Sequence, residues 1–181
     1  MTSSRFMERE ALARTIYRRT HLTGTFRLRS GSMSDEYFDK YLFESDPWLL
    51  HSIGEALVPL VPPATDALAG LELGGVPLAT MLSQLTGLPA LFVRKKAKTY
   101  GTCRLAEGGE VDGRRLMVVE DVVTSGGQVV ASCGDLRERG ALVEHAVCVI
   151  DREAGGTKNL ADVGVELRPL FTMHDLERAA G

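Results

Sequence analysis

The chain has 181 residues, of which 44% are hydrophobic and 25% charged, the size and balance of one globular domain with a real core. Its 21 basic and 24 acidic residues give a formal net charge of -3, which offers no general reason to expect nucleic acid or an anionic membrane as a partner. Cys103, Cys133 and Cys148 fit neither a disulfide framework nor a CxxC zinc site, and no stretch has the roughly 18 apolar residues of a membrane span, so we expect a soluble cytoplasmic protein.

The first 44 residues predict an N-terminal appendage. Residues 7–19 place apolar side chains at helical spacing, which predicts a short amphipathic helix. Residues 23–44 alternate apolar and polar side chains around a turn at Ser30-Gly31, which predicts two short strands in a small hood. We therefore divide the chain into an N-terminal helix and hood, residues 1–44, and a core, residues 45–181.

The core repeats strand, turn and helix. Asp46 as N-cap and Pro47 at the first helical position predict a helix whose apolar face carries Trp48, Leu49, Ile53 and Leu57. Further helices are expected at residues 76–87, 126–140 and 173–180, and strands at 64–73, 88–95, 115–121, 142–151 and 164–171. Nearly continuous apolar strands are typical of a parallel sheet that is buried on both faces. The fold class is therefore α/β, a doubly wound and mostly parallel sheet with helices on both faces.

Residues 118–128, VVEDVVTSGGQ, place two carboxylates and then a turn of small residues at the expected end of a buried strand. Ligands of open parallel sheets bind at that edge. Ser125 and Gln128 have the spacing of a capping box, and Gly126-Gly127 let the backbone approach a phosphate at the helix start. Acids beside a phosphate suit a magnesium ion or the diol of a ribose, so the combination indicates a sugar phosphate. The alternative is a capped helix after an acidic strand end, without a ligand.

The same residues resemble the phosphoribosyl diphosphate (PRPP) motif of the type I phosphoribosyltransferases. Residues 92–101, FVRKKAKTYG, resemble the catalytic loop of the orotate phosphoribosyltransferases within that family, and GTFRLRSGSMSDEYFD and VIDREAGG are similar to further segments. The likeness runs in order along nearly the whole chain. It implies the type I phosphoribosyltransferase fold and transfer of ribose 5-phosphate from PRPP to orotate, which gives orotidine 5'-phosphate and diphosphate in pyrimidine synthesis.

The resemblance also implies roles for single residues. Lys98 would be the catalytic residue, and the loop 99–112 would close over the neighbouring site of a homodimer. The PRPP-binding residues would be Arg94, Lys95, Lys98, Glu120, Asp121, Val122, Val123, Thr124, Ser125, Gly126, Gly127 and Gln128. Without the resemblance, RKKAK is an ordinary solvated strand end, although it precedes an aperiodic stretch of a length typical of lids and binding loops.

Orotate is a carboxylate, for which a guanidinium is chemically apt. The resemblance implies that orotate is bound by Thr124, Arg152, Arg29, Tyr37 and Phe38. Arg152 has the alternative of pairing with a neighbouring carboxylate on the surface, and Tyr37 and Phe38 have the alternative of being plain core.

The sequence departs from the family pattern at several positions. Tyr100 stands where a histidine is frequent, Ser32 and Met33 replace residues that are often basic, and Gly74 stands where some members have a diphosphate-binding lysine. Diphosphate binding must then rely more on RKKAK and on Mg²⁺, which we expect to be held mainly through PRPP, so no metal ligand is assigned to the chain.

Two other functions stay open at this point. One keeps the chemistry with a purine or another pyrimidine as the base. The other is a PRPP-sensing regulator, although neither the net charge nor the length supplies a nucleic-acid-binding face. The expected partners are orotate and PRPP as substrates and a second copy of the chain, with no nucleic acid and no membrane.

Overall fold

A computed structural model describes residues 7–27, 31–96 and 105–181. Its centre is a six-stranded sheet in the order β5-β4-β3-β6-β7-β8, in which β5 is antiparallel to β4 and all other neighbours are parallel. The strands are β3 (Ala67–Leu71), β4 (Ala90–Val93), β5 (Ala106–Glu107), β6 (Arg115–Val123), β7 (Leu142–Asp151) and β8 (Glu166–Thr172). The predicted parallel α/β sheet is confirmed.

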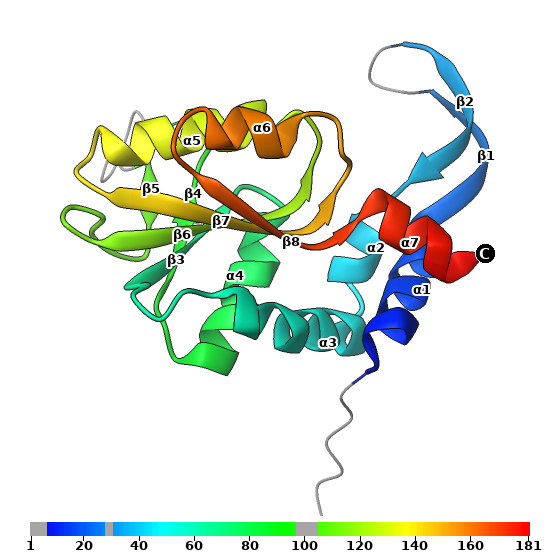
Figure 1. Cartoon of the computed structure of the whole chain (residues 1–181), viewed down its shortest axis with the longest axis horizontal. Helices are drawn as coiled ribbons and strands as arrows, with labels where there is room; N and C mark the ends of the chain where they lie inside the picture. Colours follow the sequence, from blue (N-terminus) through cyan, green and yellow to red (C-terminus); the bar gives the residue numbers. More distant parts are fainter. Residues whose placement is uncertain (1–6, 28–30, 97–104) are drawn as a thin grey trace, which may run out of the picture.

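Helices cover both faces of this sheet (Figure 1). One face carries α5 (Gly127–Arg137) and α6 (Gly156–Ala161), and the other carries α3 (Pro47–Leu57), η1 (Val58–Leu60) and α4 (Gly75–Thr86). Neighbouring residues of β6 point into different layers of the core, Val118 toward the α5 side and Val119 toward the α3 and α4 side. This alternation is the reason why both faces of an apolar strand are buried.

The N-terminal segment forms the expected helix and hairpin. Helix α1 (Arg9–Thr20) packs beside the C-terminal helix α7 (Met173–Ala180), and β1 (His21–Arg27) pairs antiparallel with β2 (Met33–Phe38) in a hood that stands away from the sheet (Figure 1).

The prediction of strand structure up to residue 44 was wrong at its end. Residues after Phe38 turn into a short helix, α2 (Tyr41–Glu44). The carboxylate of Asp39 accepts a hydrogen bond from the backbone N–H of Tyr41, which supports a helical turn, and Phe43 is fully buried in the core. Burial of this aromatic side chain fixes the turn against the rest of the protein.

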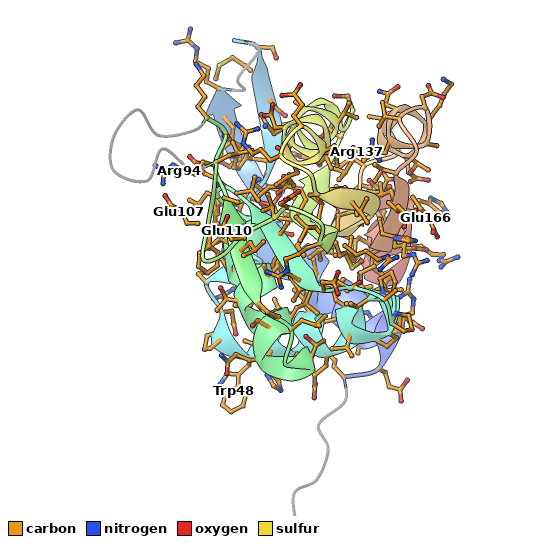
Figure 2. All side chains as sticks on the ribbon, turned by 90° about the vertical axis from the view of Figure 1, so that its left-hand side faces the viewer. Trp48, Arg94, Glu107, Glu110, Arg137 and Glu166 are labelled. Carbon is orange, nitrogen blue, oxygen red and sulfur yellow. The ribbon has the colours of Figure 1, made fainter. Side chains whose placement is uncertain are left out.

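Helix α3 confirms one local prediction and corrects another. The side chain of Asp46 accepts hydrogen bonds from Trp48 N and Leu49 N, so it is the N-cap, with Pro47 at the first position. Trp48, however, is 74% exposed and points away from the protein (Figure 2). Leu49, Ile53 and Leu57 are four residues apart and share the buried face, whereas Trp48 lies about 100° around the helix from Leu49.

The cysteines that the structure describes have a packing role. Cys133 and Cys148 are buried and free, and burial raises the pKa of the Cys133 thiol to about 11, so this thiol stays protonated and unreactive. Cys103 lies outside the described residues. Within the described part of the chain, no helix combines the length and the apolar character needed to cross a membrane.

Candidate active site

The polar residues of the 118–128 motif lie at the edge of the sheet where the parallel strands end. Strand β6 continues to Val123, so Glu120 and Asp121 lie inside the strand, two residues earlier relative to its end than the sequence predicted. The ladder to β7 explains the extension, because Val122 and Val123 still pair with Ile150 and Asp151. The turn of residues 124–126 then leads directly into α5.

This turn is built around glycine and is not capped by a side chain. Gly126 is the N-cap of α5 with φ of 75°, and a Cβ there would lie 3.3 Å from the Cα of Gly156. Asn159 Nδ2 donates a hydrogen bond to Ser125 O over 2.9 Å and ties the turn to α6. A residue with a side chain would strain the left-handed backbone at Gly126 and push against α6.

The predicted capping box of Ser125 and Gln128 is wrong. No side chain caps α5, and Gln128 Nε2 instead donates to Ser132 Oγ, 3.3 Å away within the helix. A left-handed residue at the N-cap turns the chain in a way that removes the extended backbone on which a capping box depends. The backbone N–H groups of the first turn therefore face outward without a side-chain acceptor, and the helix dipole favours an anion there.

The two acids of the motif have different surroundings. The carboxylate of Asp121 is fully buried: Lys40 Nζ lies 2.6 Å from its Oδ2, and Val122 N donates to its Oδ1. Glu120 is partly exposed, and its Oε1 accepts from Asp121 N over 3.0 Å. Adjacent residues of a strand point to opposite faces, which gives the two side chains different exposure, but their carboxyl groups stay close enough to interact.

Burial keeps two carboxyl groups of this region protonated at neutral pH. Burial, followed by the negative charge of Asp121, raises the pKa of Glu44 to about 8, and the same two causes in the same order raise the pKa of Glu120 to about 9. The positive charge of Lys40 lowers both values and is outweighed. As an anion, Glu44 would leave its buried Oε1 without a hydrogen-bond donor beside Asp121 Oδ2, so a proton on Glu44 satisfies this pair of oxygens.

We expect Glu44→Gln to flatten the pH dependence of stability. In the folded protein Glu44 keeps its proton up to about pH 8, whereas in the unfolded chain this carboxyl group loses its proton near pH 4.5. The stabilisation that comes from the protonated Glu44 side chain is therefore present at low pH and is lost as the pH rises through 8. Glutamine keeps a donor and does not titrate. From pH 5 to pH 8.5, the Tm of the variant should therefore rise relative to the Tm of the parent by roughly 10 °C, measured by calorimetry. Parallel Tm curves would show that Glu44 is not protonated in the fold.

Three of the predicted orotate-binding residues line one cavity. It has a volume of about 320 Å³ and lies between the hood, α1, the end of β7 and α7. Its lining includes Tyr37, Phe38 and Arg152, together with Tyr17, His21, Ser34, Glu36, Met173 and Glu177. Thr124 lies on the turn after β6 and is exposed, and Arg29 is outside the described residues. Tyr37 is 43% exposed, so it is available to a ligand and is not plain core.

Arg152 is held by its backbone and leaves its guanidinium available. Its N–H donates to Val123 O over 2.9 Å, which fixes it beside the end of β6. Asp151 is engaged by Thr157 Oγ1 and Glu153 N, and the Glu153 carboxylate accepts from His174 N. Within the described part of the chain, Arg152 forms no ion pair, which argues against the alternative of a surface pair with Asp151 or Glu153.

The cationic segment begins at the end of β4. Arg94 N donates to Leu105 O, and Lys95 N donates to Glu72 Oε2, so the segment is anchored on both sides. Figure 2 shows Arg94 on the same side of the molecule as Glu107 and Glu110. Lys98 and residues 99–104 of the expected loop lie outside the described residues. The rest of that loop, residues 105–112, contains strand β5, which the sequence did not predict because two residues are too few for a periodic pattern.

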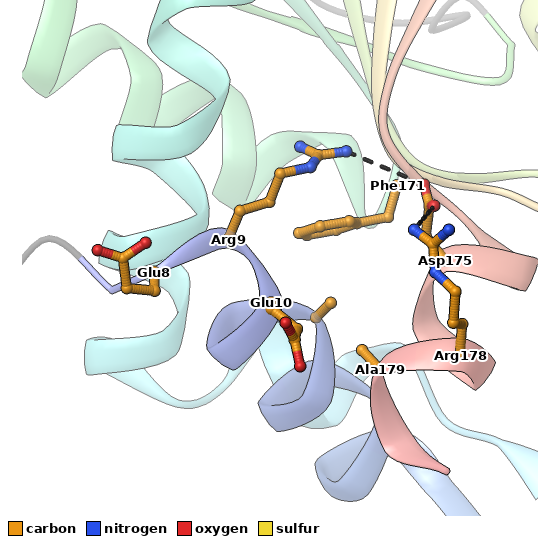
Figure 3. A pocket seen from close by; sticks show the side chains of 8 residues that line it. Glu8, Arg9, Glu10, Phe171, Asp175, Arg178 and Ala179 are labelled. Atoms are coloured by element: carbon orange, nitrogen blue, oxygen red, sulfur yellow. Dashed lines mark hydrogen bonds and ion pairs between the residues drawn. The ribbon is translucent and has the colours of Figure 1, made fainter.

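A larger cavity, of about 540 Å³, lies between α1 and α7 (Figure 3). The guanidinium of Arg9 lies 4.5 Å above the ring of Phe171, and Arg178 pairs with Asp175 over 3.1 Å. Arg9, Asp175 and Arg178 are therefore already engaged with other groups of this hollow, and Glu10 pairs with Arg14 outside it. It contains none of the residues predicted for the site, and we assign no ligand to it.

Three residues that shape the site were not predicted from the sequence. Lys40 and Glu44 reach the motif from the segment after the hood, and Asn159 reaches it from α6 (Gly156–Ala161). The short helix α6 was itself not predicted, since six residues show no helical period. The only available signal was the run of polar residues after the strand 142–151, in DREAGGTKN.

The model of the phosphoribosyl transferase domain family matches residues 62–167, and the chain belongs to this family of phosphoribosyltransferases. An orotate phosphoribosyltransferase of Nocardioides sp. is 58% identical over 158 residues, which cover 87% of this chain and 88% of the relative. One of Methanocella arvoryzae is 44% identical over 153 residues, 84% of this chain and 87% of the relative. Within the phosphoribosyltransferases, the chain therefore belongs to the orotate phosphoribosyltransferases.

Solved structures agree with this assignment. The orotate phosphoribosyltransferase of Mycobacterium tuberculosis, in complex with Fe(III) dicitrate, is similar with a TM-score of 0.84 and 31% identity, over 93% of this chain and 98% of that chain. A crystal structure of the same enzyme in complex with PRPP gives a TM-score of 0.80 and 27% identity, over 93% and 98% of the two chains.

Proposed function

We propose that this protein transfers ribose 5-phosphate from PRPP to orotate, which gives orotidine 5'-phosphate and diphosphate in pyrimidine nucleotide synthesis. The observation that carries the proposal is the juxtaposition of two features. One is a glycine-built helix start, and the other is a cavity lined by an arginine, Arg152, that has no ion pair among the described residues. The first is suited to a phosphate and the second to a planar carboxylate. Val123 O, which accepts from Arg152 N, connects the two subsites directly.

In this proposal the turn and first helical residues, 124–128, bind the 5-phosphate through backbone N–H groups and hydroxyls. Glu120 and Asp121 lie by the ribose. The side chain of Val123 is buried in the core, so Val123 contacts PRPP through its main-chain atoms. Arg94, Lys95 and Lys98 bind the diphosphate and stabilise its charge as it leaves. Lys98 acts as the catalytic residue, and residues 99–112 close over the site and keep water from the ribosyl cation-like transition state.

We propose that Mg²⁺ enters this site with the substrate and is held mainly by the oxygens of PRPP, where it would supply charge neutralisation at the diphosphate. In proteins Mg²⁺ is usually bound by substrate phosphates with one or two carboxylates and not by a cage of protein ligands. Within the described residues, no three acidic, histidine or cysteine side chains are grouped so that they could hold a metal ion. The residues of the chain then bind and orient PRPP, as the basic segment after β4 allows.

The assembly and the setting of the enzyme are part of the same proposal. We infer a cytoplasmic homodimer in which residues 99–112 reach the site of the neighbouring subunit. We also infer that residues 1–44 supply an N-terminal helix and the hood for the base, and that residues 45–181 form the phosphoribosyltransferase core. Sedimentation at several protein concentrations tests the dimer, which predicts twice the mass of the 19.7 kDa chain.

The test of the reaction is diphosphate release from PRPP with orotate as the only acceptor, with and without Mg²⁺. The proposal predicts release that requires orotate and is enhanced by Mg²⁺. Adenine, hypoxanthine and uracil, each offered in place of orotate, test the alternative of another base. Release with one of these and none with orotate would transfer the assignment to that base.

Arg152→Ala should reduce orotate affinity by about ten- to a hundredfold, since a charge-assisted hydrogen bond contributes roughly 1.5 to 3 kcal/mol. PRPP affinity should change little, because Arg152 lies in the base cavity and not on the 124–128 turn. Calorimetric titration with each substrate separates the two effects. The matched control is Arg139→Ala, in which an exposed arginine bonded only to Asp135 O is removed. Unchanged orotate affinity in the Arg152 variant would remove it from the site.

A further inference from the structure

Lys40 has no role assigned so far, although its charged side chain reaches the PRPP motif. It is the N-cap residue of α2 and follows the hood directly, yet its ammonium lies 2.6 Å from Asp121, a residue of the PRPP motif 81 positions later in the chain (121 minus 40). The Lys40 side chain is 35% exposed and the Asp121 side chain 0% exposed. An ion pair with one fully buried member is screened little by solvent, so its loss is felt strongly.

Within the described part of the chain, Lys40 is the cation that pairs with Asp121. The neighbouring groups that carry or can carry negative charge are Glu44 and Glu120, and Lys40 is the cation that acts on all three carboxyl groups. Asp39 also faces Glu44, and Tyr41 faces Lys40, with its ring centroid 5.4 Å from the ammonium. Without Lys40 the cluster would present uncompensated negative charge beside the place where a polyanionic substrate must bind.

The space around Asp121 is also closed. A Cβ at Gly74, the residue before α4, would overlap the Asp121 carboxylate and would come within 2.8 Å of Glu44 Oε1. The backbone of the loop after β3 is thus in van der Waals contact with the acid cluster, and no side chain from position 74 can supply a cation. Among the described residues, it is Lys40 that enters this space from the hood side and balances the charge of Asp121.

We propose that Lys40 is a positioning residue for PRPP: through its ion pair with Asp121, it fixes the acidic end of β6 and its following turn, and it couples the hood to the sugar-phosphate motif. Few residues separate this ion pair from the base cavity on one side and from the turn on the other. Lys40 is two residues after Phe38, which lines the base cavity, and Asp121 is three residues before Thr124, which begins the turn. The inference rests on the proposed function, since it assumes that this turn binds PRPP.

The test compares four forms of the whole protein: the parent, Lys40→Met, Lys40→Arg and Lys158→Met. Methionine keeps the length of the side chain and removes the charge, and arginine keeps the charge. Lys158 pairs with Asp162 over 2.7 Å, nearly the same distance, but both side chains are exposed, at 78% and 59%. It is therefore a matched control for the loss of a lysine-aspartate pair without burial.

PRPP binding is measured by calorimetric titration, and kcat and KM by diphosphate release. For Lys40→Met we expect PRPP affinity to fall at least tenfold and KM for PRPP to rise in parallel, with kcat at saturating PRPP reduced less than threefold. Arginine should restore most of the affinity, and Lys158→Met should bind PRPP as the parent does. Loss of general structure would not give this division between KM and kcat, nor rescue by arginine.

Lys40→Met leaves a buried carboxylate without its partner and can lower stability. The double variant Lys40→Met, Asp121→Asn removes both charges, so it should regain stability but not PRPP affinity. Parent-like PRPP binding by a folded Lys40→Met, or by the double variant, would overturn the proposal and leave the proposed reaction intact. A parent chain that binds no PRPP would overturn both.

Discussion

Lys98→Ala is expected to lower kcat by roughly a hundred- to a thousandfold, the usual effect of removing one group that stabilises charge in a transition state. In the proposed reaction, negative charge develops on the leaving diphosphate, and the ammonium of Lys98 is the group that the family resemblance assigns to it. PRPP affinity should fall far less, since Arg94 and Lys95 remain. Single-turnover measurements at saturating PRPP report the chemical step without contributions from product release.

The control for this variant is Lys96→Ala. Lys96 belongs to the same basic segment and is exposed, and it is not among the residues assigned to PRPP by name. The substitution Lys96→Ala lowers the charge of the segment by the same amount as Lys98→Ala. Comparison of the two variants therefore separates a general electrostatic effect from an effect specific to Lys98. Equal losses of kcat in both variants, or a normal kcat in Lys98→Ala, would count against Lys98 as the catalytic residue.

Gly74→Ala is expected to disturb both stability and PRPP binding. The added methyl group would overlap the Asp121 carboxylate, and this carboxylate cannot retreat without leaving Lys40. Overpacking of a tight site costs about 1 to 3 kcal/mol, which for a chain of this size lowers Tm by roughly 2–4 °C for each kcal/mol. We also expect KM for PRPP to rise, since Asp121 belongs to the proposed sugar site. Thermal unfolding and steady-state kinetics measure the two effects.

Gly134→Ala is the matched control, because Gly134 lies in α5 and a Cβ there would meet no atom within 4 Å. Alanine is favoured over glycine in a helix by about 1 kcal/mol, so this variant should be as stable as the parent or slightly more stable. If Gly74→Ala had the Tm and KM of the parent, the acid cluster would have more room than the structure gives it, and the account of Lys40 would lose its geometric basis.

The parts of the fold that sequence reasoning predicted are those determined by local patterns. Strands β6 (Arg115–Val123) and β7 (Leu142–Asp151) are long, apolar and buried on both faces, and the Asp46 cap with Pro47 identifies a helix start from adjacent residues alone. The short elements α2 (Tyr41–Glu44) and α6 (Gly156–Ala161) were missed, because four to six residues carry no periodic signal and tertiary contacts decide their conformation.

The candidate site shows the same division. The 118–128 motif and the grouping of Arg152 with Tyr37 and Phe38 were expected from resemblance, and the structure brings the last three residues to one cavity. The capping box failed because a left-handed glycine at the N-cap is visible only in the backbone. The pairing of Lys40 with Asp121 joins residues far apart in sequence, and no local pattern in a single sequence encodes such a contact.

The central claim is that the glycine turn of residues 124–128 binds the phosphorylated end of PRPP while the basic segment after β4 faces its diphosphate. The most direct test is a crystal structure of this protein with PRPP and Mg²⁺. The account predicts the 5-phosphate within hydrogen-bond distance of the backbone N–H groups at the start of α5, and the diphosphate beside Arg94 and Lys95. PRPP bound elsewhere, with this turn unoccupied, would contradict the account.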